Sequence, residues 1–343
     1  MEIVQTVNGP IHISDLGVTT PHEHIFLNIQ NQYPGKKEIY GVDGDNDKVN
    51  IQNLGILRRE GYLIRDNLII DDLDTAIYEL GYFKRAGGQT VIDLTLEDVG
   101  RDVRKLKAVS DALDINIVVG CGLYTADTVS SRFFDMDVHE LSELMIRELT
   151  VGIDDTGIKA GVIGEIGTSK EIYPIEEKAL RAAALASKAT GLPIYVHTYP
   201  WGKMALKALD IIEEYGCSPT NVCMCHVGGD LDYVTEVLKR GAYIGFDGFS
   251  KEFYIIAKPG EFAGAFETDV ERVHRLSELA EMGYEKQILS STDICFKTLL
   301  RSYGGWGYDH IYTNIIPMMK NEGLDEALIN TLIYENPIRF LSG

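Results

Sequence analysis

Short apolar runs rich in β-branched residues alternate along the chain with longer segments whose apolar residues recur every three to four positions. Runs of the first kind predict buried strands, and segments of the second kind predict amphipathic helices. Such alternation is typical of a parallel sheet covered by helices. Eight strands are predicted, over Leu16–Thr20, Thr90–Thr95, Asn116–Gly122, Lys159–Glu165, Pro193–Tyr199, Asn221–His226, Ala242–Asp247 and Gln287–Asp293.

A helix is predicted after each strand, over Asp72–Arg85, Asp102–Leu113, His139–Leu149, Ile175–Ala189, Lys203–Tyr215, Asp230–Lys239, Asp269–Met282 and Asp309–Lys320. An open doubly wound sheet would usually place a glycine-rich phosphate turn after its first strand. Here the first strand leads instead into Pro21-His22-Glu23-His24. The pattern therefore favours a (β/α)₈ TIM barrel of the α/β class, as a single domain over residues 1–343.

Three irregular segments interrupt this rhythm after strands: Ile25–Asp71, Gly248–Thr268 and the glycine-aromatic stretch Tyr303–Tyr308. In a barrel, loops that follow strands lie on the carboxyl face, where active sites are built. We expect these three segments to shape the functional site.

Composition narrows the possible partners. The chain has 343 residues, 45% of them hydrophobic, and a formal net charge of −20. So acidic a surface repels nucleic acid and anionic membranes. No apolar run approaches the roughly 20 residues that span a bilayer, and the N-terminus lacks a basic segment followed by an apolar one. Five scattered cysteines fit reduced thiols, so we expect a cytoplasmic protein.

Polar side chains that bind metals occupy the ends of five predicted strands. His22 and His24 are two apart, so both can point into the barrel mouth. Imidazoles and carboxylates gathered there would suit zinc, manganese, iron or cobalt, and a carboxylate can bridge two cations. The predicted ligands are His22, His24, Glu165, His197, His226 and Asp293.

Other polar residues near these ligands are the cysteines before His226, which are predicted to be structural, and Asp247, for which two roles remain open. Cys223 and Cys225 lie on the strand that ends at His226. If His226 faces the barrel interior, alternation predicts that both cysteines face the helical layer or lie off the metal site, as packed thiols. Asp247 ends the seventh strand and is either a substrate contact or a structural hydrogen-bond acceptor.

The sequence resembles the phosphotriesterase family of the amidohydrolase superfamily over nearly the whole chain. The resemblance is carried by Leu16–His24, Lys159–Ser169, Val196-His197-Thr198, Cys225-His226, Ser291-Thr292-Asp293 and Glu335-Asn336-Pro337. It implies a distorted barrel with two divalent cations, in which His22, His24 and Asp293 hold one ion and His197 and His226 hold the other.

The resemblance also implies how the two ions are bridged. Where well-known members carry a carboxylated lysine, this chain has Gly164 followed by Glu165. It is therefore similar to the phosphotriesterase homology protein branch, in which a glutamate is the bridge. Because neighbouring strand residues face opposite ways, this one-residue shift requires a local departure from regular strand geometry.

Substrate contacts are predicted in the loops. Tyr124 matches a position where lactonases of the family carry a tyrosine, and its alternative role is loop packing. Aromatic residues such as Trp201, Phe249, Phe253, Tyr303 and Trp306 form either an apolar wall or lid packing, and Lys251, Lys297 and Arg301 are candidate anion contacts. The predicted substrate-binding residues are Tyr124, Lys251, Trp201, Phe253 and Lys297.

The sequence thus favours a binuclear hydrolase, most readily with Zn²⁺, that opens a lactone or carboxylic ester of a small molecule by a metal-bridging hydroxide. Asp293 is expected to accept the proton and return it to the leaving group. One alternative is a phosphotriesterase or phosphoester hydrolase on the same metals. Another is a barrel that binds ligands without catalysis. A homodimer is expected from the resemblance.

Overall fold

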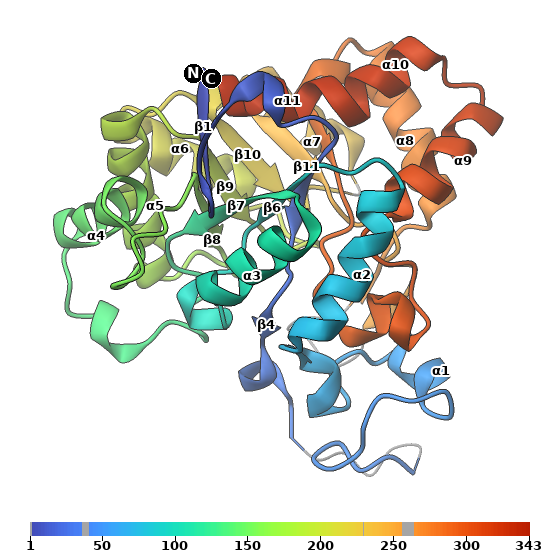
Figure 1. Cartoon of the computed structure of the whole chain (residues 1–343). Helices are drawn as coiled ribbons and strands as arrows, with labels where there is room; N and C mark the ends of the chain where they lie inside the picture. The colour runs from blue at the N-terminus through green and yellow to red at the C-terminus, as the bar shows by residue number, and fades with distance from the viewer. Residues whose placement is uncertain (1, 36–40, 229, 256–263) are drawn as a thin grey trace.

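Eight parallel strands form the central sheet of the computed structural model, which describes residues 2–35, 41–228, 230–255 and 264–343 (Figure 1). All eight predicted strands are present. The first runs over Thr19–Glu23 instead of the predicted Leu16–Thr20, so it ends later and contains His22. The strands, in chain and sheet order, are β3 (Thr19–Glu23), β6 (Thr90–Asp93), β7 (Asn116–Cys121), β8 (Val162–Gly167), β9 (Ile194–His197), β10 (Val222–Cys225), β11 (Tyr243–Phe246) and β14 (Ile288–Ser290).

The first and last strands of this sheet meet and close it into a (β/α)₈ barrel. The backbone N–H of Asp293 donates to the carbonyl of His22, at 3.3 Å. The carboxylate of Glu23, fully buried, accepts hydrogen bonds from Thr292 and from the backbone N–H of Ile294. Closure brings the carboxyl ends of all eight strands around one mouth.

Side chains that alternate along the strands fill the barrel interior. The interior residues come from different strands and include Val118, Tyr195 and Leu289. Their sequence neighbours Val119 and Val196 face the other way and pack against the helices. Val4, Leu16, Phe340 and Leu341 belong to the same interior cluster. The interior is therefore packed rather than hollow, as in other barrels of this type.

Helices surround the sheet, and most begin at a polar capping residue. The first seven are α2 (Leu73–Arg85), α3 (Val103–Leu113), α4 (Val138–Thr150), α5 (Pro174–Thr190), α6 (Ala205–Glu214), α7 (Leu231–Lys239) and α8 (Asp269–Glu281). Asp72, Asp102, Asp137 and Asp230 each accept a backbone hydrogen bond at a helix start. Such caps satisfy N–H groups that the helix leaves unpaired.

The segment Asp309–Lys320, predicted as one helix, is divided into two elements. A π-helical turn covers Ile311–Ile315, and α9 follows at Ile316–Asn321. Pro317 lacks a backbone N–H, which disfavours a regular α-helix across this point. The chain then continues through α10 (Glu326–Asn330), a second π turn and α11 (Asn336–Ser342).

The long insertions carry short elements of their own. The described residues of the first insertion, 25–35 and 41–71, contain β4 (Leu27–Asn28), α1 (Leu54–Leu57) and β5 (Ile69–Ile70) and extend beyond the barrel wall (Figure 1). The predicted insertion Gly248–Thr268 contains β12 (Tyr254–Ile255) and β13 (Gly264–Ala265), and its residues 256–263 lie outside the described part of the chain. A hairpin of β1 (Ile3–Thr6) and β2 (Gly9–His12) precedes the barrel. No helix among the described residues has the length and apolar character that crossing a membrane requires.

Candidate metal centre

All six predicted ligands converge at the mouth formed by the carboxyl ends of the strands. Each lies near the carboxyl end of a strand or up to three residues beyond it, and His22 and His24 belong to the same strand end, that of β3. Because the strands are parallel and the sheet is closed, residues far apart in sequence meet there. Their side chains are all buried or nearly so. The cluster consists of His22, His24, Glu165, His197, His226 and Asp293.

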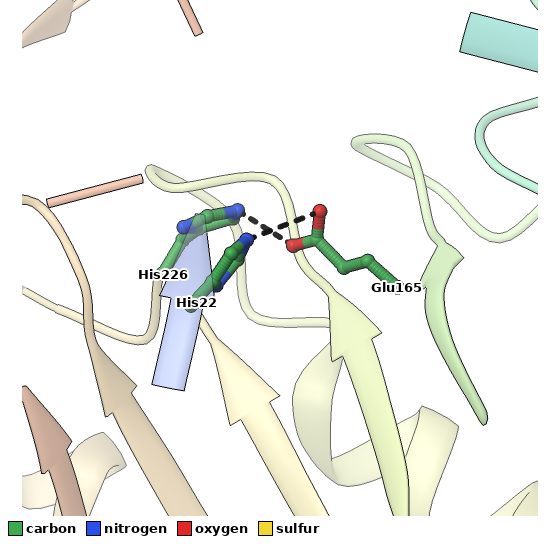
Figure 2. A group of neighbouring side chains, drawn as sticks. All are labelled: His22, Glu165 and His226. Carbon is green, nitrogen blue, oxygen red and sulfur yellow. Dashed lines mark ion pairs between the residues drawn. The ribbon is translucent and has the colours of Figure 1, made fainter. Parts of the chain in front are cut away.

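Glu165 lies at the centre of the four imidazoles. Its Oε2 is 3.5 Å from His22 Nε2, and its Oε1 is 2.9 Å from His226 Nε2 (Figure 2). Oε1 is also 3.3 Å from His197 Nδ1, and Oε2 is 4.0 Å from His24 Nε2. One carboxylate thus faces histidines from both predicted ligand groups, as a bridging carboxylate must.

Asp293 lies on the other side of the β3 histidines. Its Oδ1 is 3.1 Å from His24 Nε2 and 3.7 Å from His22 Nε2. Its Oδ2 accepts a hydrogen bond from the buried ammonium of Lys251. The two oxygens therefore have separate partners, with Oδ1 turned toward the histidines.

Polar partners fix three of the four rings from behind. Asp247 Oδ2 lies 3.0 Å from His22 Nδ1, and Asp247 Oδ1 lies 2.8 Å from His226 Nδ1. Thr95 Oγ1 lies 2.9 Å from His24 Nδ1. When Nδ1 donates to an oxygen, the Nε2 lone pair is left for a metal. Of the two roles that the sequence left open for Asp247, these contacts support the structural acceptor.

The backbone at Gly164 places Glu165 inside the barrel. Ile163 and Ile166 both pack toward the helices, so the strand contains one extra residue between them, and the pairing of β8 with β9 shifts at the same point. Gly164 has φ +106°, a conformation that suits glycine. The local departure from regular strand geometry predicted for this branch is confirmed.

A left-handed residue also explains why one sequence prediction was wrong. Cys223 and Cys225 belong to the barrel-interior cluster and do not face the helical layer. His226 has φ +60°, which breaks the alternation and turns its ring inward after an inward-facing Cys225. Alternation applies only within a regular strand, and His226 lies just beyond β10. Both thiols are fully buried, as expected for packing residues.

The carboxylates make this centre strongly negative. Burial lowers the pKa of His226, but the charges of Asp247 and Glu165 outweigh it and raise the pKa to about 9. The pKa of His22 is likewise raised, with burial opposed mainly by Glu165. Burial raises the pKa of Glu165, yet the surrounding histidines bring it well below its usual value. The carboxylates therefore favour positive charge at His22 and His226, whereas burial lowers the pKa of His197.

The donor set fits divalent cations. The ligand atoms of His22, Glu165 and His226 lie within 4.8 Å of one another, as do those of His22, His24 and Asp293. Among the described residues, the buried His22 Nε2 makes no hydrogen bond, although buried polar atoms are nearly always paired. Imidazole and carboxylate ligands suit zinc and neighbouring transition metals.

A cavity of about 620 Å³ opens above the cluster. His24, His197, His226 and Asp293 form part of its lining. Four of the predicted substrate residues line it as well, namely Tyr124, Lys251, Trp201 and Phe253. Tyr124 OH is 3.1 Å from His197 Nδ1, and burial raises the pKa of the phenol well above its usual value, so the phenol keeps its proton.

Several candidate contacts lie elsewhere. Lys297 is absent from the described lining, and its Nζ is 2.8 Å from Asp66 Oδ1. Arg301 pairs with Asp309, and Trp306 stacks on His310. Phe249 is fully buried beside Phe246. The structure therefore does not bring Lys297 to the cavity, because an acidic residue of the first insertion holds its ammonium.

An aromatic wall, defined here as Trp201, Phe266, Phe253, Phe296 and Tyr62, runs along one side of the cavity. Successive ring centroids are 4.9, 5.2, 6.0 and 5.2 Å apart. Sequence reasoning did not find Tyr62 and Phe266, because each lies in an insertion without periodicity. Nor did it find Arg272, a lining residue that the sequence places on an ordinary helix.

A closed (β/α)₈ barrel with this arrangement of histidines and carboxylates at its mouth defines the class of barrel hydrolases with a candidate metal centre. The chain belongs to the phosphotriesterase family, whose model matches residues 2–341. The family resemblance predicted from the sequence is confirmed.

Named relatives extend this result. The chain is 33% identical to the N-acetyltaurine hydrolase of Dictyostelium discoideum, over 99% of this chain and 97% of the relative. A resiniferatoxin-binding protein from Rhodobacter sphaeroides superposes with a TM-score of 0.95 at 32% identity, over 99% and 95% of the two chains.

Two further solved structures are similar. The phosphotriesterase homology protein of Escherichia coli, solved with phosphate in its active site, gives a TM-score of 0.77 at 27% identity, over 95% of this chain and 99% of its own. A lactonase from Listeria monocytogenes gives 0.78 at 26% identity, over 99% and 98%. These neighbours agree with the predicted homology-protein branch.

Proposed function

We propose that the chain is a metal-dependent hydrolase that cleaves a carboxylic ester, lactone or amide of a small molecule. The observation that carries this proposal is the convergence of four imidazoles on Glu165 and Asp293, with His22 Nε2 left without a hydrogen bond. The sequence alone favoured esters and lactones. The amide is added because relatives at about one-third identity are named N-acetyltaurine hydrolase.

We propose that His22, His24 and Asp293 hold one divalent cation, that His197 and His226 hold a second, and that Glu165 joins the two. Bound there, such cations supply a hydroxide nucleophile at neutral pH and polarise the scissile carbonyl. Zn²⁺ is our first choice of ion, and Mn²⁺, Co²⁺ or Fe²⁺ also suit this donor set.

Asp293 is the proposed proton carrier. One oxygen faces the histidines while the other is held by Lys251, so the carboxylate stays oriented toward the reacting centre. During attack it accepts the proton of the nucleophile, and it then protonates the leaving oxygen or nitrogen. Lys251 serves as a positioning residue for this carboxylate.

Substrate binding is assigned to the cavity. Tyr124 offers a phenol O–H beside His197, where it can donate to the carbonyl oxygen of the substrate. Trp201 and Phe253 offer apolar surface, and the Trp201 indole N–H is already used by Ala265 O at 3.0 Å, which leaves the ring faces for the substrate.

Metal content and a substrate panel test this function. Protein loaded with Zn²⁺ or Mn²⁺ is expected to hold about two ions per chain and to hydrolyse at least one of an alkyl γ-lactone, p-nitrophenyl acetate and N-acetyltaurine. Paraoxon represents the alternative phosphotriesterase activity. Preferential turnover of paraoxon would replace the proposed function by that alternative, and protein without bound metal or any turnover would favour a binding barrel.

The histidine variants supply the control. H22A and H197A each remove a proposed ligand of a different ion, so each is expected to hold less metal and to lose turnover. H274A removes a surface histidine that pairs with Glu322, and it should retain both.

A further inference from the structure

The guanidinium of Arg272 lines the wall of the cavity but makes little use of its donors. Arg272 lies in the first turn of α8 and is 5% exposed. Among the described residues its hydrogen bonds are both long, to Asp269 Oδ1 at 3.3 Å and to the carbonyl of Lys251 at 3.5 Å. Because a guanidinium carries five N–H donors, most of its capacity is unused.

Gly248 provides the space in which this guanidinium lies. A Cβ at Gly248 would stand 2.8 Å from one terminal nitrogen of Arg272 and 3.0 Å from its Nε. Gly248 lines the same cavity, directly after Asp247. Any larger residue there would displace the guanidinium, so the loop after β11 and the first turn of α8 together form a seat for it.

The neighbouring charges leave Arg272 as the available cation of this wall. The ammonium of Lys251 is engaged by Asp293. The carboxylate of Asp269 is shared, since it also accepts the backbone N–H of Ser250 at 2.9 Å and lies 2.7 Å from His310 Nε2. The carboxylates of Glu267 and Asp247, which also line the cavity, act on Arg272 in addition to Asp269. Among the described residues neither accepts a hydrogen bond from the guanidinium, so most of its N–H donors remain open to a ligand.

We propose that Arg272 anchors an anionic group of the substrate, a carboxylate or a sulfonate, on the same small molecule that presents its carbonyl to the metal centre. This inference rests on the proposed function and specifies its substrate class. A planar fork of N–H groups pairs with two oxygens of such an anion, and these charge-assisted bonds are strong in a buried site. The apolar wall would contact the remainder of the molecule.

Two amides that differ only in charge test the anchor. N-acetyltaurine carries a sulfonate where N-acetylethanolamine carries a hydroxyl. We expect the metal-loaded wild type to favour the sulfonate, and R272Q to raise KM for it by about 10- to 100-fold with little change for the hydroxyl compound. R272K should recover part of the loss, because it keeps the charge but not the fork.

A second variant and a matched control guard against misfolding. G248A keeps every charge but fills the seat, so it should also weaken N-acetyltaurine selectively. R240Q removes an arginine that pairs with Asp210 at 3.0 Å, and neither residue is among the lining residues, so this variant should behave as wild type. If R272Q does not fold, G248A decides.

Calorimetry separates the anchor from hydrolysis. Sodium propanesulfonate has the anion but no scissile bond, and its dissociation constant should rise at least about tenfold in R272Q and not in R240Q. Such binding without turnover of any amide or ester would preserve the anchor while refuting the proposed function. Equal propanesulfonate binding by wild type and both R272Q and G248A, or an equal loss for charged and neutral amides, would overturn the anchor.

Discussion

Two carboxylates at the mouth of the barrel have different surroundings and, in the function proposed above, different roles. Asp293 touches His24 through one oxygen and Lys251 through the other. The carboxylate of Asp247 contacts the Nδ1 atoms of His22 and His226, which are not the atoms proposed to bind metal. These different surroundings predict different consequences for two substitutions of the same kind.

The first prediction concerns Asp293→Asn. The amide keeps an oxygen for the cation but cannot accept a proton, so much of the metal should remain while kcat falls by about 10²- to 10⁴-fold. Turnover kinetics and elemental analysis of the same preparation measure both quantities. Normal turnover by D293N would contradict the role assigned to this carboxylate.

The second prediction concerns Asp247→Asn. Loss of the charge behind two ligand rings should weaken metal binding by about 10- to 100-fold, as with other groups that orient metal-bound histidines. Competition with a chelator measures the affinity. D127N removes a cavity carboxylate that hydrogen-bonds Thr125 and contacts none of these rings, so it is the control. Equal affinities in D247N and wild type would show that the rings need no such support.

At the scale of elements, β8 is the strand that departs from regular geometry to deliver Glu165. Its backbone approaches β9 so closely that a Cβ at Gly164 would stand 2.1 Å from the carbonyl oxygen of Tyr195. The atom in the way belongs to the backbone, so it has little freedom to move. Bridge position and strand packing are therefore fixed by the same glycine.

The third prediction follows from this contact. G164A should destabilise the fold by about 2 kcal/mol or more, through both the clash and the left-handed φ, and should lower metal content by displacing Glu165. G157A is the matched control, because Gly157 has φ +72° but nothing within 4 Å of its would-be Cβ. Denaturant unfolding compares them, and equal losses in both variants would exclude the clash as the cause.

The fourth prediction concerns the docking of the first insertion. Asp66 accepts hydrogen bonds from Lys297 and Lys48. Burial raises the pKa of Asp66, but these bonds outweigh it and lower the pKa below its ordinary value. Since the folded pKa lies below the unfolded one, the stabilisation is full above about pH 4 and is lost as pH falls through the folded pKa.

D66N should remove this dependence. The difference in unfolding free energy between wild type and D66N is expected to shrink as the pH is lowered from 6 toward 3, and denaturant titrations at several pH values measure it. A difference that stays constant over this range would mean that the ion pairs contribute nothing to docking.

At the scale of the whole molecule, the candidate metal centre includes residues from both strands at which the barrel closes. Glu23 links β3 to the segment after β14. The three residues proposed to hold one ion come from these two edges of the sheet: His22 and His24 from the end of β3, and Asp293 from the segment after β14. Bound cations would add a second link across the same seam. Stability and metal binding should therefore be coupled.

The fifth prediction is that chelation destabilises the barrel. Removal of ions present at about 100 times their dissociation constant costs about 2.7 kcal/mol per site, which lowers the unfolding temperature by on the order of 5–10 °C. Scanning calorimetry with and without a chelator, followed by addition of Zn²⁺, measures the loss and its reversal. An unfolding temperature that does not respond to either step would contradict the coupling.

The sequence by itself determined the eight strands, most of the helices and the six candidate ligands. It could do so because these depend on local signals: hydrophobic periodicity and polar residues at strand ends. The family resemblance also implied that β8 is irregular, because Glu165 stands one position after Gly164, where well-known members carry the bridging lysine. Closure of a parallel barrel then brings strand ends together wherever they lie in the sequence.

Only the tertiary structure decided the contacts that cross between insertions and barrel. The pairing of Lys297 with Asp66, the wall made by Tyr62 and Phe266, and the seat of Arg272 beside Gly248 join segments without shared periodicity. The left-handed turn at His226 likewise reverses an orientation that alternation predicted. Local patterns place a residue on its element, but backbone turns and packing between distant segments decide what its side chain touches.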